Sequence, residues 1–250
     1  MAELCLLVTT SVLPGEVTRR VTVALALLLP LMLLSRAPEE TPRIRFLPEA
    51  RRAWLLLLFL PLFLLLISGI SIGWGELAKL LGVAIQKAEP MADLPSAILL
   101  DALLPAVCEE VFCRGAVYSV LRPLGRRVAV PASALIFALM HMSVAQLPHA
   151  LVAGLLLALL YEIGGLAFPI IFHFTSNFTS LLLLFGASPL YVFASLGVLA
   201  AVSLPLLCLL WRRLGRPRLV RESAVIGAWR SLLASPLALW GVLVLTLTFL

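Results

Sequence analysis

Long apolar runs separated by short polar linkers are the main pattern of this 250-residue chain. A membrane-spanning helix needs about 20 consecutive, mostly apolar residues, and eight stretches approach that length. They lie at residues 21–34, 54–74, 96–121, 128–145, 147–163, 166–185, 190–211 and 236–250. The pattern therefore predicts an all-α fold, a polytopic membrane helix bundle with about eight transmembrane helices.

The linkers between these stretches are mostly brief, and the longest three cover residues 35–52, 75–95 and 212–230. In residues 75–95, leucines 77, 80 and 81 repeat at helical spacing, which predicts an amphipathic helix at the membrane interface. The chain shows no internal repeat and no break in composition. We therefore expect residues 1–250 to form a single membrane domain.

The composition agrees with a chain that the bilayer solvates. Hydrophobic residues make up 62% of it and charged residues 13%, whereas soluble proteins average about 45–50% and about 25%. The 19 basic and 13 acidic side chains are too few to cover a soluble domain of this size. Its four cysteines are scattered through apolar stretches, so we expect neither a disulfide framework nor a cysteine metal site.

The net charge of +6 reflects membrane topology rather than binding to nucleic acid, because the basic residues cluster between the apolar runs. With eight spans, the loops after spans one, three, five and seven hold 14 of the 19 basic residues, against 4 on the other side. The positive-inside rule then places those loops in the cytoplasm and both termini outside. The compact build favours a multi-pass protein of the bacterial cytoplasmic membrane, with membrane lipid as its surroundings.

Ionisable residues within the predicted spans are the candidates for chemistry, because each costs at least about 2.5–3.5 kcal/mol to insert. In residues 96–121, Glu110 and Arg114 stand four residues apart and can pair along one helix face. Glu109 points about 100° away on such a helix and is left free to act as a general base toward water. The alternative is a buried structural network that only locks helix packing.

Two further spans carry polar pairs at the same spacing. His141 follows Phe137 by four residues, and Asn177 follows His173 by four, so each pair shares a helix face. An asparagine can orient a water molecule or stabilise an oxyanion. Taken singly, the histidines also fit packed core residues, and His173 and Asn177 fit hydrogen bonds between helices.

The depths of these groups favour one shared site. At a rise of about 1.5 Å per residue, Glu109, His141 and Asn177 each lie about 20 Å from the cytoplasmic end of their helix, and His173 about 14 Å. Independent structural networks would have little reason to align in one slab. Two carboxylates, two imidazoles and an amide at one depth predict hydrolysis by an activated water.

A metal is the open question at this site. Glu109, His141 and His173 could together hold a divalent ion such as zinc. The usual HExxH spacing is absent from the chain, so spacing alone does not imply the metal.

In this order, the three patterns resemble the motifs of the CAAX-protease and bacteriocin-processing (CPBP) family of intramembrane endopeptidases. That family includes prenyl-protein endopeptidases and abortive-infection proteins. The patterns stand here as Glu109-Glu110-Val111-Phe112-Cys113-Arg114, Phe137-Ala138-Leu139-Met140-His141 and His173-Phe174-Thr175-Ser176-Asn177. The resemblance covers residues 96–186, which we expect to form the catalytic core.

The resemblance implies an eight-helix bundle that hydrolyses a peptide bond in a membrane-associated peptide or protein, prenylated or not. Glu109 would activate water with help from His141. His173 and Asn177 would stabilise the tetrahedral oxyanion, while Glu110, Arg114 and Phe137 would shape the site.

Two other functions remain open from the residues. One is a catalytically silent scaffold or immunity-type protein that binds a partner, and the other is a proton-coupled transporter that uses the buried carboxylates as a relay. The remaining polar groups in the spans have simpler interpretations. We expect His149 and Glu162 to reach the interface from the ends of their span, and Asp101 to be structural.

Overall fold

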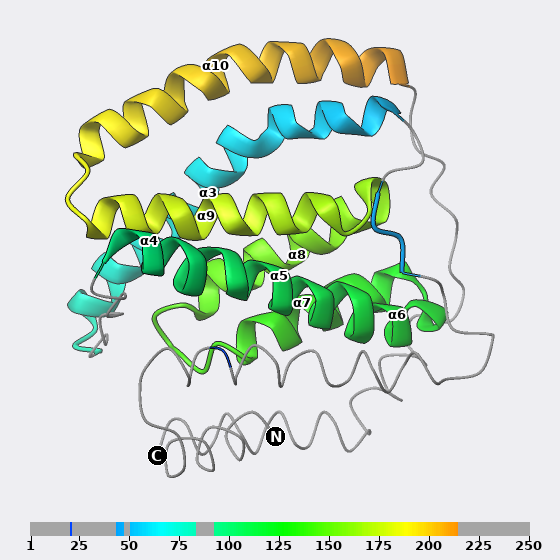
Figure 1. The fold of residues 1–250 in the computed structure, drawn as a ribbon, viewed down its shortest axis with the longest axis horizontal. Coiled ribbons are helices and arrows are strands. Elements are labelled where there is room, and N and C mark those ends of the chain that lie inside the picture. Colours follow the sequence, from blue (N-terminus) through cyan, green and yellow to red (C-terminus); the bar gives the residue numbers. More distant parts are fainter. Residues whose placement is uncertain (1–20, 22–43, 48–50, 84–92, 215–250) are drawn as a thin grey trace.

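In a computed structural model of the chain, residues 21, 44–47, 51–83 and 93–214 are described, and Figure 1 draws them in colour. These residues form helices joined by turns, with no strand among them, which confirms the all-α prediction. The predicted spans at 21–34 and 236–250 lie outside the described residues, apart from Val21.

The order of the helices along the chain is η1 (Arg51–Phe59), α3 (Leu60–Leu80), α4 (Leu94–Ala97), η2 (Ile98–Leu103), α5 (Leu104–Glu110), η3 (Val111–Val117), α6 (Tyr118–Leu121), η4 (Arg122–Leu124), α7 (Arg126–Leu139), α8 (Leu147–Gly164), α9 (Ala167–Leu184) and α10 (Pro189–Leu214). Here η1 and η4 are 3-10 helices, and η2 and η3 are π-helices. The segments from α4 to α6 follow one another without a break, so residues 94–121 form one long helix with two π-helical stretches. Such stretches are often found at functional sites.

Four of the described helices are long and apolar enough to cross a membrane. They are Trp54–Leu80, Leu147–Gly164, Ala167–Leu184 and Pro189–Leu209, which correspond to four of the eight predicted spans. The protein is therefore an integral membrane protein, although the described residues do not establish the count of eight.

Successive long helices run in opposite directions, because short turns join them (Figure 1). One end of the bundle holds the start of η1, the turn at Gly125 and the turn at Gly165. We call it the arginine-rich end, because Arg45, Arg122 and Arg126 lie there. The opposite end holds the end of α3, the start of α4 and the turns at residues 140–146 and 185–188.

Small residues allow α7 and α8 to pack closely. A methyl group added at Gly154 of α8 would lie 2.9 Å from Cα and 3.0 Å from the carbonyl oxygen of Ala134 in α7. Helix pairs in membranes commonly approach over glycine and alanine in this way, because packing rather than water exclusion drives their association. This contact fixes the distance between the helix that ends before His141 and the helix that begins after it.

Polar contacts fasten the arginine-rich end. The carboxylate of Glu162 in α8 accepts a hydrogen bond from the Tyr118 hydroxyl, is paired with Arg126, and lies 3.5 Å from Nε of Arg122. The guanidinium of Arg45 donates to the carbonyl oxygens of Tyr161 and Glu162. Glu162 therefore has the structural role that its place near the end of a span predicted.

The segment 44–47 covers the turn between α8 and α9. The carbonyl oxygens of Arg45 and Phe46 accept hydrogen bonds from the backbone N–H groups of Leu166 and Ala167, at 2.9 and 3.0 Å. These donors at the start of α9 have no partner within their own helix. Gly165 has a φ of 76° and carries no side chain toward this segment, so the segment can lie directly against the turn.

The predicted end of the span at 128–145 is wrong. The stretch predicted as a span at 128–145 is a helix only to Leu139, and Met142, with a φ of 48°, lies in the turn that follows. Apolar residues continue through that turn, so hydrophobicity does not mark where the helix ends. Leu77 and Leu80, part of the amphipathic helix expected in residues 75–95, belong to α3, which continues to Leu80, and residues 84–92 of that stretch lie outside the described residues.

The α7–α8 contact predicts a clear difference between two glycine substitutions. Gly154→Ala should lower the free energy of unfolding by about 1–3 kcal/mol, because the methyl group collides with backbone atoms. Gly73→Ala in α3 is the matched control, since nothing lies within 4 Å of the added methyl group. Thermal unfolding of both variants in detergent measures the difference, and equal stability of the two would contradict the close approach of α7 and α8.

Candidate active site

The side chains of Glu110 and Arg114 form a fully buried ion pair at the centre of the bundle. Both are 0% exposed. Nη1 of Arg114 donates to Oε1 of Glu110 at 3.0 Å and lies 2.9 Å from Oε2. Nη2 donates to the carbonyl oxygen of Gly154 at 2.9 Å. The four-residue spacing predicted this pair. The hydrogen bond from Arg114 to Gly154 also holds the long helix 94–121 against α8.

His173 of α9 lies between the two adjacent glutamates. Its Nδ1 is 2.9 Å from Oε1 of Glu110, and its Nε2 is 3.9 Å from Oε2 of Glu109. A carboxylate only accepts hydrogen bonds, so Nδ1 of His173 carries the hydrogen when Glu110 is ionised. The two glutamates, which point in different directions, therefore address opposite edges of one imidazole ring.

His141 lies just beyond the end of α7. Its Nδ1 is 2.8 Å from the carbonyl oxygen of Phe137, and because that oxygen can only accept, Nδ1 carries the hydrogen. In the neutral ring, Nε2 then presents its lone pair. This nitrogen lies 3.9 Å from Oε2 of Glu109, so the backbone bond selects the atom that faces the glutamate.

The ring of Phe137 packs against the polar groups of the site. It is 2% exposed, and the guanidinium carbon of Arg114 lies 4.7 Å from its centroid. Its edge-on contacts with the rings of His141 and His173 have centroid distances of 4.9 and 5.4 Å. One aromatic residue therefore fixes the positions of the cation and of both imidazoles.

These contacts converge on one oxygen atom. Oε2 of Glu109 is buried and makes no hydrogen bond with any described residue, yet it lies 3.9 Å from Nε2 of both His141 and His173. A separation of 3.9 Å is too long for a direct hydrogen bond. The carboxylate and the imidazoles therefore make no direct hydrogen bond, and a bridging water molecule satisfies such buried groups in many proteins.

Among the described residues, no group of three or more His, Cys, Asp and Glu side chains is arranged to hold a metal ion. Glu109, His141 and His173 nevertheless supply the oxygen and nitrogen donors that zinc takes in hydrolases. Zinc at these three residues stays a prediction.

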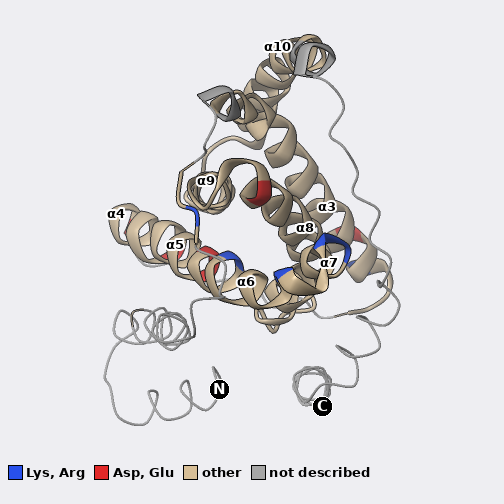
Figure 2. Ribbon diagram, turned by 90° about the vertical axis from the view of Figure 1, so that its right-hand side faces the viewer, with Lys and Arg blue, Asp and Glu red and all other residues tan. Residues whose placement is uncertain are grey.

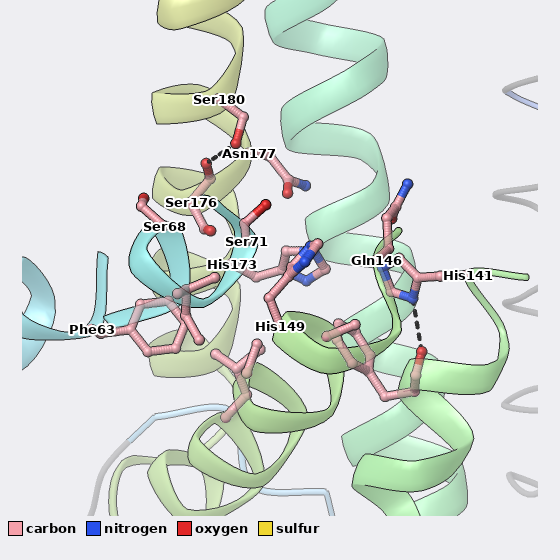
Figure 3. Close-up of a pocket in the computed structure, with 15 residues that line it drawn as sticks. Phe63, Ser68, Ser71, His141, Gln146, His149, His173, Ser176, Asn177 and Ser180 are labelled. Carbon is pink, nitrogen blue, oxygen red and sulfur yellow. Dashed lines mark hydrogen bonds between the residues drawn. The ribbon is translucent and has the colours of Figure 1, made fainter. Parts of the chain in front are cut away.

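A cavity of about 100 Å³ opens beside the imidazoles (Figure 3). His141, His173 and Asn177 line it, so the structure brings the second and third sequence motifs to one space. Glu110 and Arg114 are buried behind His173, and Glu109 lies beside both imidazoles. The contacts above show that these predicted site residues lie close together. The role of each residue in a reaction stays a prediction.

The cavity also includes polar residues that the sequence analysis did not assign to the site. They are Ser68 and Ser71 of α3, Gln146 and His149 at the start of α8, and Ser176 and Ser180 of α9. His149, expected at the interface, instead points into the cavity (Figure 3), and its Nδ1 is buried without a hydrogen bond to a described residue. Serines spaced along apolar helices were the only sequence signal, and serine is common enough in membrane helices to carry little information.

A comparison with protein families finds a match to the family described as type II CAAX prenyl endopeptidase Rce1-like, over residues 92–179. The matched region contains all three motifs and confirms the family resemblance. No curated protein and no solved structure matches the chain.

The buried ion pair predicts that Arg114→Lys destabilises the protein, although the charge is kept. An ammonium cannot bond Glu110 and the Gly154 carbonyl in the same planar geometry, and a buried polar group left without a partner costs about 1–3 kcal/mol. Arg122→Lys is the control, since its half-exposed side chain should tolerate the change within about 0.5 kcal/mol. Equal unfolding temperatures for wild type and Arg114→Lys would contradict the role given to the guanidinium.

Proposed function

We propose, from the premise that residues 92–179 form an Rce1-like domain, that the protein is an intramembrane endopeptidase. It would hydrolyse a peptide bond in a membrane-associated peptide or protein through a water that Glu109 activates. The observation that supports this proposal most directly is the position of Glu109 Oε2, buried and 3.9 Å from both imidazole Nε2 atoms.

The protonation of the two histidines suits a water at this place. Nε2 of His141 and Oε2 of Glu109 both accept hydrogen bonds, and a water molecule has two hydrogens to donate. If His173 carries hydrogens on both nitrogens, its Nδ1–H bonds to Glu110 and its Nε2–H faces Glu109 or the substrate.

The reaction then proceeds by general-base catalysis. Glu109 takes one proton from the water as the water oxygen forms a bond to the carbonyl carbon of the scissile peptide. The carbonyl oxygen becomes an oxyanion, and Nε2–H of His173 and the amide of Asn177 are the donors for it. The C–N bond then breaks, the proton held by Glu109 passes to the leaving nitrogen, and a carboxylic acid and an amine are released.

A divalent metal, if bound by Glu109, His141 and His173, would supply a more acidic water and a positive charge near the oxyanion. Nε2 of His173 would then be a metal ligand rather than a donor to the substrate carbonyl, and Glu110, Arg114 and Phe137 would still fix the position of its ring.

Glu109→Gln tests the proposal, because the amide is nearly isosteric but cannot accept the proton of water. We expect peptide cleavage to fall by a factor of about 100 or more, with the unfolding temperature preserved. The assay uses purified protein in liposomes and a quenched fluorescent peptide library, prenylated and unprenylated, with and without a chelator. Glu76→Gln, an exposed residue of α3, is the matched control and should cleave like wild type.

Three results of this assay separate the alternatives. Cleavage that persists in Glu109→Gln would refute the assigned base. Cleavage that chelator abolishes and zinc restores would establish the metal. A folded wild type that cleaves no member of the library would favour a silent scaffold that binds a partner.

A further inference from the structure

The lining of the cavity changes from apolar to polar along α3, changes from polar to apolar along α8, and is polar throughout on α9. On α9, polar residues follow His173 toward the end of the helix, through Asn177 to Ser180. On α3, Phe63 and Ile67 are succeeded by Ser71. On α8 the order is reversed, with Gln146 and His149 first and Ala153 and Leu157 after them. Because α8 runs opposite to α3 and α9, Ser71, Gln146 and Ser180 all lie toward one and the same end of the bundle.

That end is the one opposite to the arginines. Ser180 is exposed, whereas Phe63, Phe137 and Leu157 at the other side of the cavity are at most 2% exposed. Beyond these apolar residues, toward the arginine-rich end, the contacts of Glu162 with Tyr118, Arg122 and Arg126 hold the helix ends together. The cavity therefore has a polar mouth and an apolar floor.

Two tryptophans give the depth of the mouth in the membrane. Trp54 and Trp74 stand 20 residues apart on the η1–α3 helix, which corresponds to about 30 Å, the thickness of the hydrocarbon core. Tryptophan is enriched at both interfaces. Nε1 of Trp74 donates to the carbonyl oxygen of Val144 at 2.9 Å, so the turn at residues 140–146 lies at the interface of the opposite end. Ser71 is three residues from Trp74, about 4.5 Å along the helix.

The distribution of basic residues then assigns the two ends to the two sides of the membrane. Among the side chains that the structure describes, the arginine-rich end includes those of Arg45, Arg122, Arg126 and Arg127, while the opposite end has that of Lys79. Figure 2 looks onto the arginine-rich end, with its basic residues in blue. Such an asymmetry places the arginine-rich end in the cytoplasm.

We infer that the candidate active site opens to the non-cytoplasmic side of the membrane, and that its substrate is a peptide segment exposed on that side. That this segment is cleaved rests on the proposed function, whereas the side on which the cavity opens does not. The hydroxyl, amide and imidazole groups of the mouth can form hydrogen bonds with a peptide backbone. That backbone would belong to an exported peptide or to an outward-facing part of a membrane protein. From the arginine-rich end, a segment confined to the cytoplasm would have to pass the contacts of Glu162 and the apolar floor of the cavity.

Single cysteines labelled by a membrane-impermeant maleimide test the inference in intact cells. Ser180→Cys reports the mouth of the cavity, Ser188→Cys the turn at the opposite end, and Leu124→Cys the arginine-rich end; all three positions are exposed. We expect Ser180→Cys to be labelled to the same extent as Ser188→Cys. Leu124→Cys should be labelled only after the cells are permeabilised, and the labelling of the parent chain is subtracted from each value.

Labelling of Ser180→Cys only after permeabilisation would overturn the inference. Labelling of Leu124→Cys in intact cells, with Ser188→Cys protected, would overturn it as well. Protection of Ser180→Cys under both conditions, with full labelling after denaturation, would also overturn it, because the mouth would then be closed to water. None of these results depends on catalysis. An enzyme that loses activity in Glu109→Gln but is labelled from the cytoplasm would leave the proposed function standing and refute only the side of access.

Discussion

The carboxylate of Glu110 is the group on which the rest of the site depends. It is completely buried in a bundle with few charges, and a buried charge is tolerated only when it is paired and hydrogen-bonded. Arg114 of the same helix and His173 of α9 provide the partners. Because Arg114 also bonds the Gly154 carbonyl of α8, this one carboxylate joins three helices at the depth where the chemistry is proposed.

The adjacent glutamate is placed by the same contacts. With His173 held by Glu110 and His141 held by the Phe137 carbonyl, both Nε2 atoms lie at equal distance from Oε2 of Glu109. The two neighbouring carboxylates therefore have different surroundings. That of Glu110 is paired with Arg114, and that of Glu109 faces the imidazoles. The cavity continues this polarity toward one end of the bundle, where Asn177 and the serines lie.

Much of this was predictable from the sequence, because membrane spans and i, i+4 pairs are local patterns. Four spans and the Glu110–Arg114 pair follow from hydropathy and spacing alone. The end of α7 at Leu139 was not predictable, since the turn after it is as apolar as the helix. Nor was the cavity lining, because His149 and Ser71 reach one space only through the packing of α3, α8 and α9, which depends on long-range contacts.

A double-mutant cycle on Glu110 and His173 tests most directly whether this carboxylate organises the site. Glu110→Gln, His173→Gln and the double variant are unfolded in detergent, and the free energies of unfolding are compared. Residues in one buried network couple by about 0.5–3 kcal/mol, and we predict a coupling in the upper half of that range, with the double variant less damaged than the sum of the single ones. Additive losses would show that the two residues act independently and would contradict the account.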